Sequence, residues 1–226
     1  MSFARPVPSP VLRCEVTWSD GAGGNASEER EIADDAVARA AMASFAAATL
    51  LATPRGPAAV ETLRPGDAVR VHGVAQPARL VWSGTALDPG GPAGGSFRVM
   101  AHAFGSGRPA ADVVLGPGAH VLLETRRCIP LCGVARAFSP VAALEDGVRV
   151  VAIRPPAPVA AFGLACAGQV ALSASGLPVA AWHPAAAHGH ARIGDLARAI
   201  PPLARAAFGP ASLAYLSASE ARDLAG

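Results

Sequence analysis

The sequence lacks several features that would place it in a common functional class. None of its 226 residues is lysine, so all 19 cationic side chains are arginine. The arginines are dispersed and the net charge is only +2, which favours a mixed, solvated surface over a nucleic-acid interface. Aromatic residues are also few, with three Trp, one Tyr and seven Phe, so a platform for stacking bases is not expected.

Metal-binding patterns are absent as well. The four cysteines are Cys14, Cys128, Cys132 and Cys166. The closest two are four residues apart with no histidine nearby, which is poor zinc spacing, so we interpret all four as small core residues, with a disulfide as the less favoured alternative. His183, His188 and His190 lack flanking Asp, Glu or Cys, which favours an exposed loop over a metal site. We therefore expect no metal and no cofactor.

No long apolar segment is present. The most apolar run, residues 40–53, is short and interrupted by Ser and Thr, so no membrane span is expected. Residues 1–10 contain three Pro and no apolar core, which argues against a Sec signal peptide. These patterns predict a cytoplasmic or non-classically secreted protein and leave the compartment open.

The composition instead favours many short strands. There are 24 Gly and 21 Pro, and 51% of the residues are hydrophobic, enough for a packed core broken by frequent turns. We expect a mainly β fold, a type II turn at Pro65-Gly66 that Asp67 caps, and His120–Glu124 as one of the strands. Acidic residues after Ser27 predict a helix over Ser27–Met42. Further helices are expected over Ile193–Ile200 and over Ser217–Leu224, the last with a capping box.

Several ordered motifs carry a family resemblance. They are Ser44-Phe45, Thr53-Pro54-Arg55-Gly56, Leu63-Arg64-Pro65-Gly66-Asp67, Gln76 to Gly84, Leu115 to Leu123, and Leu172 to Pro178. In this order and spacing the chain resembles the bacterial hedgehog/intein (Hint) domain, in which the first motif begins with a reactive Cys. The resemblance implies a Hint-like horseshoe of two pseudo-symmetric β halves with short helical flanks. It predicts an N-terminal flank over residues 1–43, a Hint-like domain over 44–183 and a helical tail over 184–226.

The resemblance also implies a reaction, self-cleavage of the bond Ala43–Ser44. A side-chain nucleophile attacks the preceding carbonyl and turns the amide into an ester or thioester. A histidine then protonates the departing amide nitrogen. In this chain the nucleophile position holds Ser44, whose hydroxyl needs an adjacent base, whereas a thiol is intrinsically more nucleophilic.

The histidine position has also changed, since in a gapless alignment it is Ala119. The neighbouring His120 would face away from Ala43–Ser44, because successive strand residues point to opposite faces. A bulge at Gly118-Ala119 would restore its direction. Cys166 to Gln169 replace a charged stretch of the family, and Ala48 replaces a turn glycine.

Loss of catalysis with retention of the fold explains these replacements most simply. The sequence therefore predicts a degenerate Hint domain that acts as a structural or interaction module, with a protein partner left unidentified. The alternative is slow self-cleavage at Ala43–Ser44, with Ser44 as the nucleophile and His120 as the acid.

Overall fold

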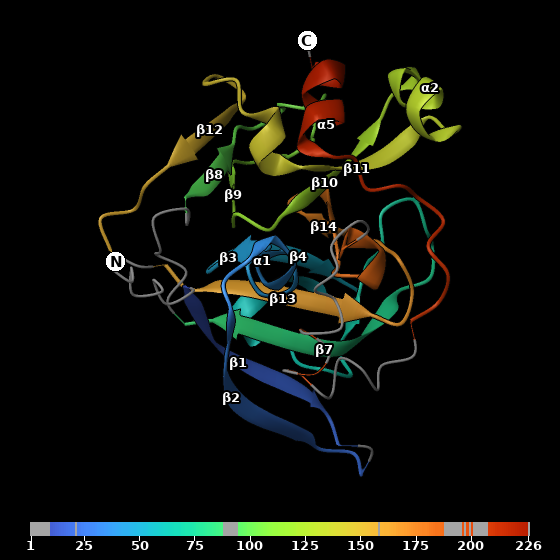
Figure 1. Cartoon of the computed structure of the whole chain (residues 1–226). Coiled ribbons are helices and arrows are strands. Elements are labelled where there is room, and N and C mark those ends of the chain that lie inside the picture. The colour runs from blue at the N-terminus through green and yellow to red at the C-terminus, as the bar shows by residue number, and fades with distance from the viewer. Residues whose placement is uncertain are drawn as a thin grey trace, which may run out of the picture.

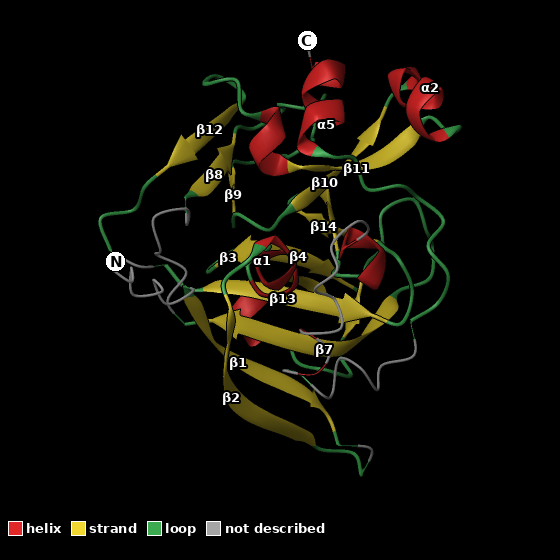
Figure 2. Ribbon diagram, viewed as in Figure 1, coloured by secondary structure: helices red, strands yellow, loops and turns green. Residues whose placement is uncertain are grey.

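The computed structural model describes residues 10–225, apart from 21, 88–94, 158, 188–195, 197, 199 and 201–207. The expectation of a mainly β fold is confirmed: the described residues form two antiparallel sheets with a few short helices (Figure 2). This architecture is consistent with the all-β fold that the resemblance implies.

The larger sheet has nine strands among the described residues. In spatial order they are β12 (Val150–Ile153), β8 (Ser96–Val99), β9 (Val113–Leu115), β3 (Phe45–Ala46), β13 (Ala161–Cys166), β7 (Ala78–Ala86), β1 (Val11–Ser19) and β2 (Asn25–Ala33), with β6 (Ala68–Val69) also paired to β7. The hairpin of β1 and β2 ends this sheet and projects from the body (Figure 1). Its register is continuous from Val11↔Ala33 to Ser19↔Asn25.

The smaller sheet has six described strands. Their order is β11 (Arg136–Pro140), β10 (His120–Glu124), β15 (Leu177–Ala180), β14 (Ala171–Ala174), β4 (Leu50–Thr53) and β5 (Gly56–Ala59). The helices are α1 (Ala36–Met42), α2 (Ile129–Cys132) and α5 (Ala218–Ala225), and the short 3₁₀ turns are η1 (Val60–Thr62), η2 (Arg126–Cys128), η3 (Val141–Leu144) and η4 (Pro184–Ala187). In Figure 1, α2 and α5 lie at the end of the molecule opposite the β1–β2 hairpin.

Two apolar clusters form most of the core. The first joins the sheets, since it contains Phe45 and Leu115 from the larger sheet and Leu51 and Val121 from the smaller. The second lies beneath α1, where the buried side of that helix packs against β7 and β13, and it also contains Leu12, Cys14 and Val16 of β1. Ser44 follows Ala43 of the second cluster and precedes Phe45 of the first, so the candidate cleavage bond lies between the two.

One expected helix is wrong over most of its length. Ser27–Met42 was predicted to be helical, yet residues 25–33 form β2 and only Ala36–Met42 is helical. The reason is tertiary pairing: β1 buries Leu12, Cys14 and Val16 and needs a partner, and β2 supplies it. The acidic residues that suggested a helix start suit the solvated edge of a sheet, where charge discourages pairing with other chains.

Other local expectations are confirmed. Gly66 has φ +96° and the N–H of Asp67 donates to Arg64 O at 3.0 Å, which makes the expected turn, and an Asp67 carboxylate oxygen accepts from Arg64 N. Ser217 and Glu220 form the capping box of α5. All four cysteines are free thiols, and three of them are buried.

The histidine-rich segment departs from its expected exposure. His183 is buried, and its Nε2 lies 2.9 Å from Gly209 O, so it is not part of an exposed loop. His188 and His190 lie outside the described residues, as does most of the helix expected over Ile193–Ile200. Within the described residues no cluster of His, Cys, Asp or Glu could hold a metal ion.

Candidate functional site

The candidate cleavage bond lies directly after α1. Asp35 starts this helix because its carboxylate accepts hydrogen bonds from the N–H groups of Val37 at 3.0 Å and Ala38 at 2.9 Å. Ala43 ends it, donating its N–H to Arg39 O at 2.8 Å. The chain then turns into β3, so Ser44 is held between a capped helix and a central strand.

Three glycines let the end of α1 approach the sheets closely. A Cβ on Gly116 would lie 2.2 Å from Ala43 O, and one on Gly118 would lie 1.9 Å from Arg39 O. A Cβ on Gly163 would lie 1.5 Å from Ala41 O. No real Cβ contact is that short, so these positions accept only glycine while α1 keeps its place.

Backbone hydrogen bonds fix both sides of the bond Ala43–Ser44. The carbonyl oxygen of Ala43 accepts from the N–H of Gly118 at 2.9 Å. The N–H of Ser44 donates to the carbonyl oxygen of Phe162 at 3.0 Å. The first contact would stabilise negative charge on the carbonyl oxygen, as one donor of an oxyanion hole does. The second contact supplies no proton, because a carbonyl oxygen only accepts.

The hydroxyl of Ser44 lies among carbonyl oxygens. The side chain is 4% exposed, and Oγ donates to Ala40 O at 3.1 Å, with Gly118 O at 3.4 Å. Ala40 O belongs to the last turn of α1, the negative end of the helix dipole. This environment opposes formation of an alkoxide, and neither carbonyl can remove the hydroxyl proton as a base.

Ala119, which a gapless alignment assigns to the family's histidine position, is part of the apolar core. It is 1% exposed and belongs to the same cluster as Phe45. Cys166, in the stretch that was predicted to replace charged residues of the family, belongs to this cluster too, and burial raises the pKa of its thiol to about 12. Both positions therefore contribute packing and no ionised group near neutral pH.

His120 opens onto a different region from Ala119. Ala119 is in the core and His120 is not, as expected for neighbours whose side chains point to opposite faces. The pairing of β10 with β11 runs from His120↔Pro140 to Glu124↔Arg136 without a shift. The Nδ1 of His120 lies 3.0 Å from Gly118 O, which requires Nδ1 to carry a hydrogen and donate it. Desolvation lowers the pKa of His120 to about 4, despite the opposing effect of this hydrogen bond.

His120 and Ser44 nevertheless converge on one atom. Both Nδ1 of His120 and Oγ of Ser44 lie within hydrogen-bonding distance of Gly118 O. His120 also faces a pocket of about 660 Å³ that α1, β10 and α5 line. Arg39, which forms a bidentate ion pair with Asp34 at 2.6 and 2.7 Å, lies at its edge.

Sequence reasoning named Ser44, Ala119 and His120 but missed the importance of Gly118. Gly118 donates its N–H to Ala43 O, and its carbonyl oxygen is shared by Ser44 and His120. The signal was present in Gly116-Pro117-Gly118, since paired glycines beside a proposed reacting bond indicate a close backbone approach.

Comparison with known proteins gives one result at the level of a family. A family model described as "Hint domain" matches residues 43–186, which begin one residue before Ser44. No curated protein and no solved structure shows significant similarity to the chain.

Proposed function

We propose that this chain, which belongs to the Hint domain family, is an autoprocessing-type domain that has lost self-cleavage and acts as a structural or interaction module. One observation carries the proposal: the amide nitrogen of Ser44 donates to Phe162 O, and among the described residues no hydrogen bond joins it to an ionisable side chain.

The chemistry makes that nitrogen decisive. An amine leaves a tetrahedral intermediate only after its nitrogen is protonated. Phe162 O cannot give a proton, and Ala119 carries only a methyl group where the family has an imidazole. The Ser44 hydroxyl adds a second barrier, because it donates to carbonyl oxygens and, among the described residues, to no base.

The packing of the N-terminal segment supports retention of an intact chain. β1 pairs with β7 from Cys14↔Ala86 to Trp18↔Trp82, and five of the seven residues of α1 are buried. Release of residues before Ser44 would expose the second core cluster to water, at a large cost in hydrophobic free energy. We therefore infer that this segment is a structural part of the domain, although Ala43–Ser44 marks the family's usual boundary.

A second candidate function is slow self-cleavage at Ala43–Ser44. The N–H of Gly118 on Ala43 O favours it, because that contact would polarise the carbonyl under attack. His120 would have to act as the acid. With a pKa of about 4 it is neutral near pH 7, and its only ring proton is directed at Gly118 O. This route therefore requires His120 to leave its present hydrogen bond and reach the Ser44 nitrogen.

Restoring the missing groups tests the proposal. Mass spectrometry under denaturing conditions is applied to Ser44→Cys, Ala119→His and the double variant after incubation with dithiothreitol, which captures a thioester. Cleavage in the double variant and not in the single variants supports loss of two reactive groups from an intact scaffold. Cleavage of wild type that His120→Ala abolishes would instead establish the second candidate. If the folded double variant stays whole, either the assignment of Ala119 to the histidine position is wrong or the other replaced positions, Cys166–Gln169 and Ala48, are also needed for cleavage.

None of the helices that the structure describes is long and apolar enough to cross a membrane.

The proposed interaction role implies a protein partner, which is still to be identified. Affinity purification of the tagged chain from its native host tests the interaction role: a stoichiometric partner supports it, and a chain that is recovered alone under gentle conditions argues for a freestanding structural role.

A further inference from the structure

We infer that a second pocket, remote in sequence from Ser44, binds a small carboxylate with an apolar tail. The pocket has a volume of about 270 Å³ and lies where β10, β15, η3 and α5 meet. None of its lining residues belongs to the cleavage site or to the pocket that His120 faces. Its lining residues are Phe104, Arg108, Leu122, Leu123, Glu124, Thr125, Arg127, Leu144, Arg149, Val150, Pro178 and Leu224.

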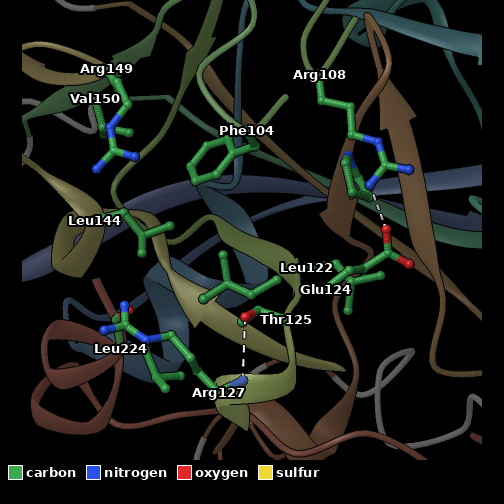
Figure 3. Close-up of a pocket in the computed structure, with 12 residues that line it drawn as sticks. Phe104, Arg108, Leu122, Glu124, Thr125, Arg127, Leu144, Arg149, Val150 and Leu224 are labelled. Carbon is green, nitrogen blue, oxygen red and sulfur yellow. Dashed lines mark hydrogen bonds and ion pairs between the residues drawn. The ribbon is translucent and has the colours of Figure 1, made fainter. Parts of the chain in front are cut away.

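The lining is apolar in the middle. Leu122 and Leu144 are each 7% exposed and Val150 is 1% exposed, so these side chains are held by the core. Figure 3 shows Phe104, Leu122 and Leu144 lying between the arginine side chains. An apolar surface with a few fixed polar groups at its edge is the usual composition of a small-molecule site.

Three arginines surround this apolar lining, and each is held by one bond. Arg108 donates through Nη1 to Glu124 at 2.6 Å, Arg149 donates through Nε to Asp146 at 2.6 Å, and Arg127 donates through Nη1 to Leu224 O at 2.7 Å. A guanidinium group has five N–H donors, so each arginine keeps further donors for a ligand. Because these hydrogen bonds limit rotation of the three arginine side chains, their remaining N–H donors are partly preorganised for binding an anion.

The local charge fits a singly charged head group. Three guanidinium groups face two carboxylates, those of Glu124 and Asp146, which leaves one uncompensated positive charge. Hydrogen bonds from the backbone and from Arg149 hold the pKa of Asp146 well below its usual range. Burial raises the pKa of Glu124, but the hydrogen bonds from His72 and Arg108 outweigh it and lower the pKa overall. Both carboxylates are therefore ionised near neutral pH, and a carboxylate ligand completes the charge balance.

The size of the pocket limits the apolar tail. At about 30 Å³ for each water-sized group, the volume holds about nine such groups. Octanoate is close to this size, and so is the carboxyl-terminal leucine of a peptide. The shared chemistry is a carboxylate on a compact aliphatic tail, which arginine recognises through paired N–H donors.

Titration calorimetry with octanoate at low salt tests the inference. We expect saturable binding by wild type, with binding at least about tenfold weaker for 1-octanol and for octyltrimethylammonium, which lack the negative charge. Arg149→Gln and Arg127→Gln should each weaken octanoate binding several-fold. Arg55→Gln changes an exposed arginine outside the lining and should leave octanoate binding unchanged.

Further measurements distinguish the two sources of a carboxylate ligand and define the results that would overturn the inference. A short peptide ending in leucine, tested as the free acid and as the amide, distinguishes a protein carboxyl terminus from a free fatty acid: tighter binding of the acid than of octanoate indicates the former. Equal binding of octanoate and 1-octanol, or equal loss of octanoate binding in Arg55→Gln and Arg149→Gln, would overturn the carboxylate assignment. Absence of octanoate and peptide binding at millimolar concentration to the folded wild type would overturn the site itself.

Discussion

The glycine pair Gly163 and Gly84 gives the sharpest test of how α1 is seated. The two residues are directly paired across β13 and β7, and both face the end of α1. A Cβ on Gly163 would lie 1.5 Å from the backbone oxygen of Ala41. A Cβ on Gly84 would lie 2.3 Å from Sδ of Met42, the far part of a flexible side chain.

These contacts predict unequal costs for the same substitution. In Gly163→Ala the helix has to move away by about 1.5 Å to reach an allowed contact, because a backbone oxygen cannot rotate aside. We expect Gly163→Ala to lower the free energy of unfolding by about 3 kcal/mol or more. In Gly84→Ala the new Cβ would meet only side chains, Sδ of Met42 and the ring of Trp82 at 3.0 Å, and both side chains are fully buried. Side chains can shift more easily than a helix backbone, so a smaller cost of about 2 kcal/mol is expected.

Urea unfolding followed by circular dichroism measures both variants. Gly168→Ala is the matched control, since a Cβ at Gly168 meets nothing within 4 Å. It should change stability by less than about 0.5 kcal/mol. Equal stabilities of Gly163→Ala and Gly84→Ala would refute the close approach of α1 to β13 and, with it, the position of Ala43–Ser44.

Three further predictions concern single residues near the site. Ala48 has φ +64°, a conformation that favours glycine, so Ala48→Gly should raise the free energy of unfolding by up to about 1 kcal/mol, and a decrease would contradict the strained turn. Asp35→Ala should cost about 1 kcal/mol through loss of the α1 cap, whereas Asp35→Asn, which keeps an acceptor oxygen, should cost much less. The pKa of His120 is lowered from 6.5 to about 4 in the folded chain, so on acidification the unfolded chain takes up this proton first. The free energy of unfolding should therefore fall by about 3 kcal/mol as the pH is lowered from 6.5 to 4. In urea titrations from pH 7 to pH 4, wild type should lose this amount relative to His120→Gln, and parallel pH profiles would contradict burial of a neutral imidazole.

Local sequence patterns predicted the strands and turns that short-range chemistry determines. His120–Glu124 forms the expected strand as β10, Pro65-Gly66 makes its turn, and Ser217 with Glu220 caps α5. The pattern of residues 27–35 was misleading, because acidic residues suit both a helix start and a charged edge strand. Only the pairing of β2 with β1 decides between them, and that pairing is a tertiary interaction.

The site was predictable only in part. Motif spacing predicted the family, which a match over residues 43–186 confirms, whereas the roles assigned to Ser44 and Ala119 stay predictions. The role of Gly118 depends on a contact between residues 75 positions apart, with Ala43 O, and no local pattern encodes it. The arginine-lined pocket is harder still to foresee, since its lining residues extend from Phe104 to Leu224 and meet only in the folded chain.

The central proposal is that the bond Ala43–Ser44 stays intact because none of the described residues is placed to protonate its nitrogen. Its most direct test is the intact mass of the purified wild-type chain after prolonged incubation with hydroxylamine, which cleaves esters. The measurement has to be made under denaturing conditions, because β1, β2 and α1 would hold a cleaved N-terminal segment in place. We expect a single species of 22.6 kDa. A fragment that begins at Ser44 would contradict the account.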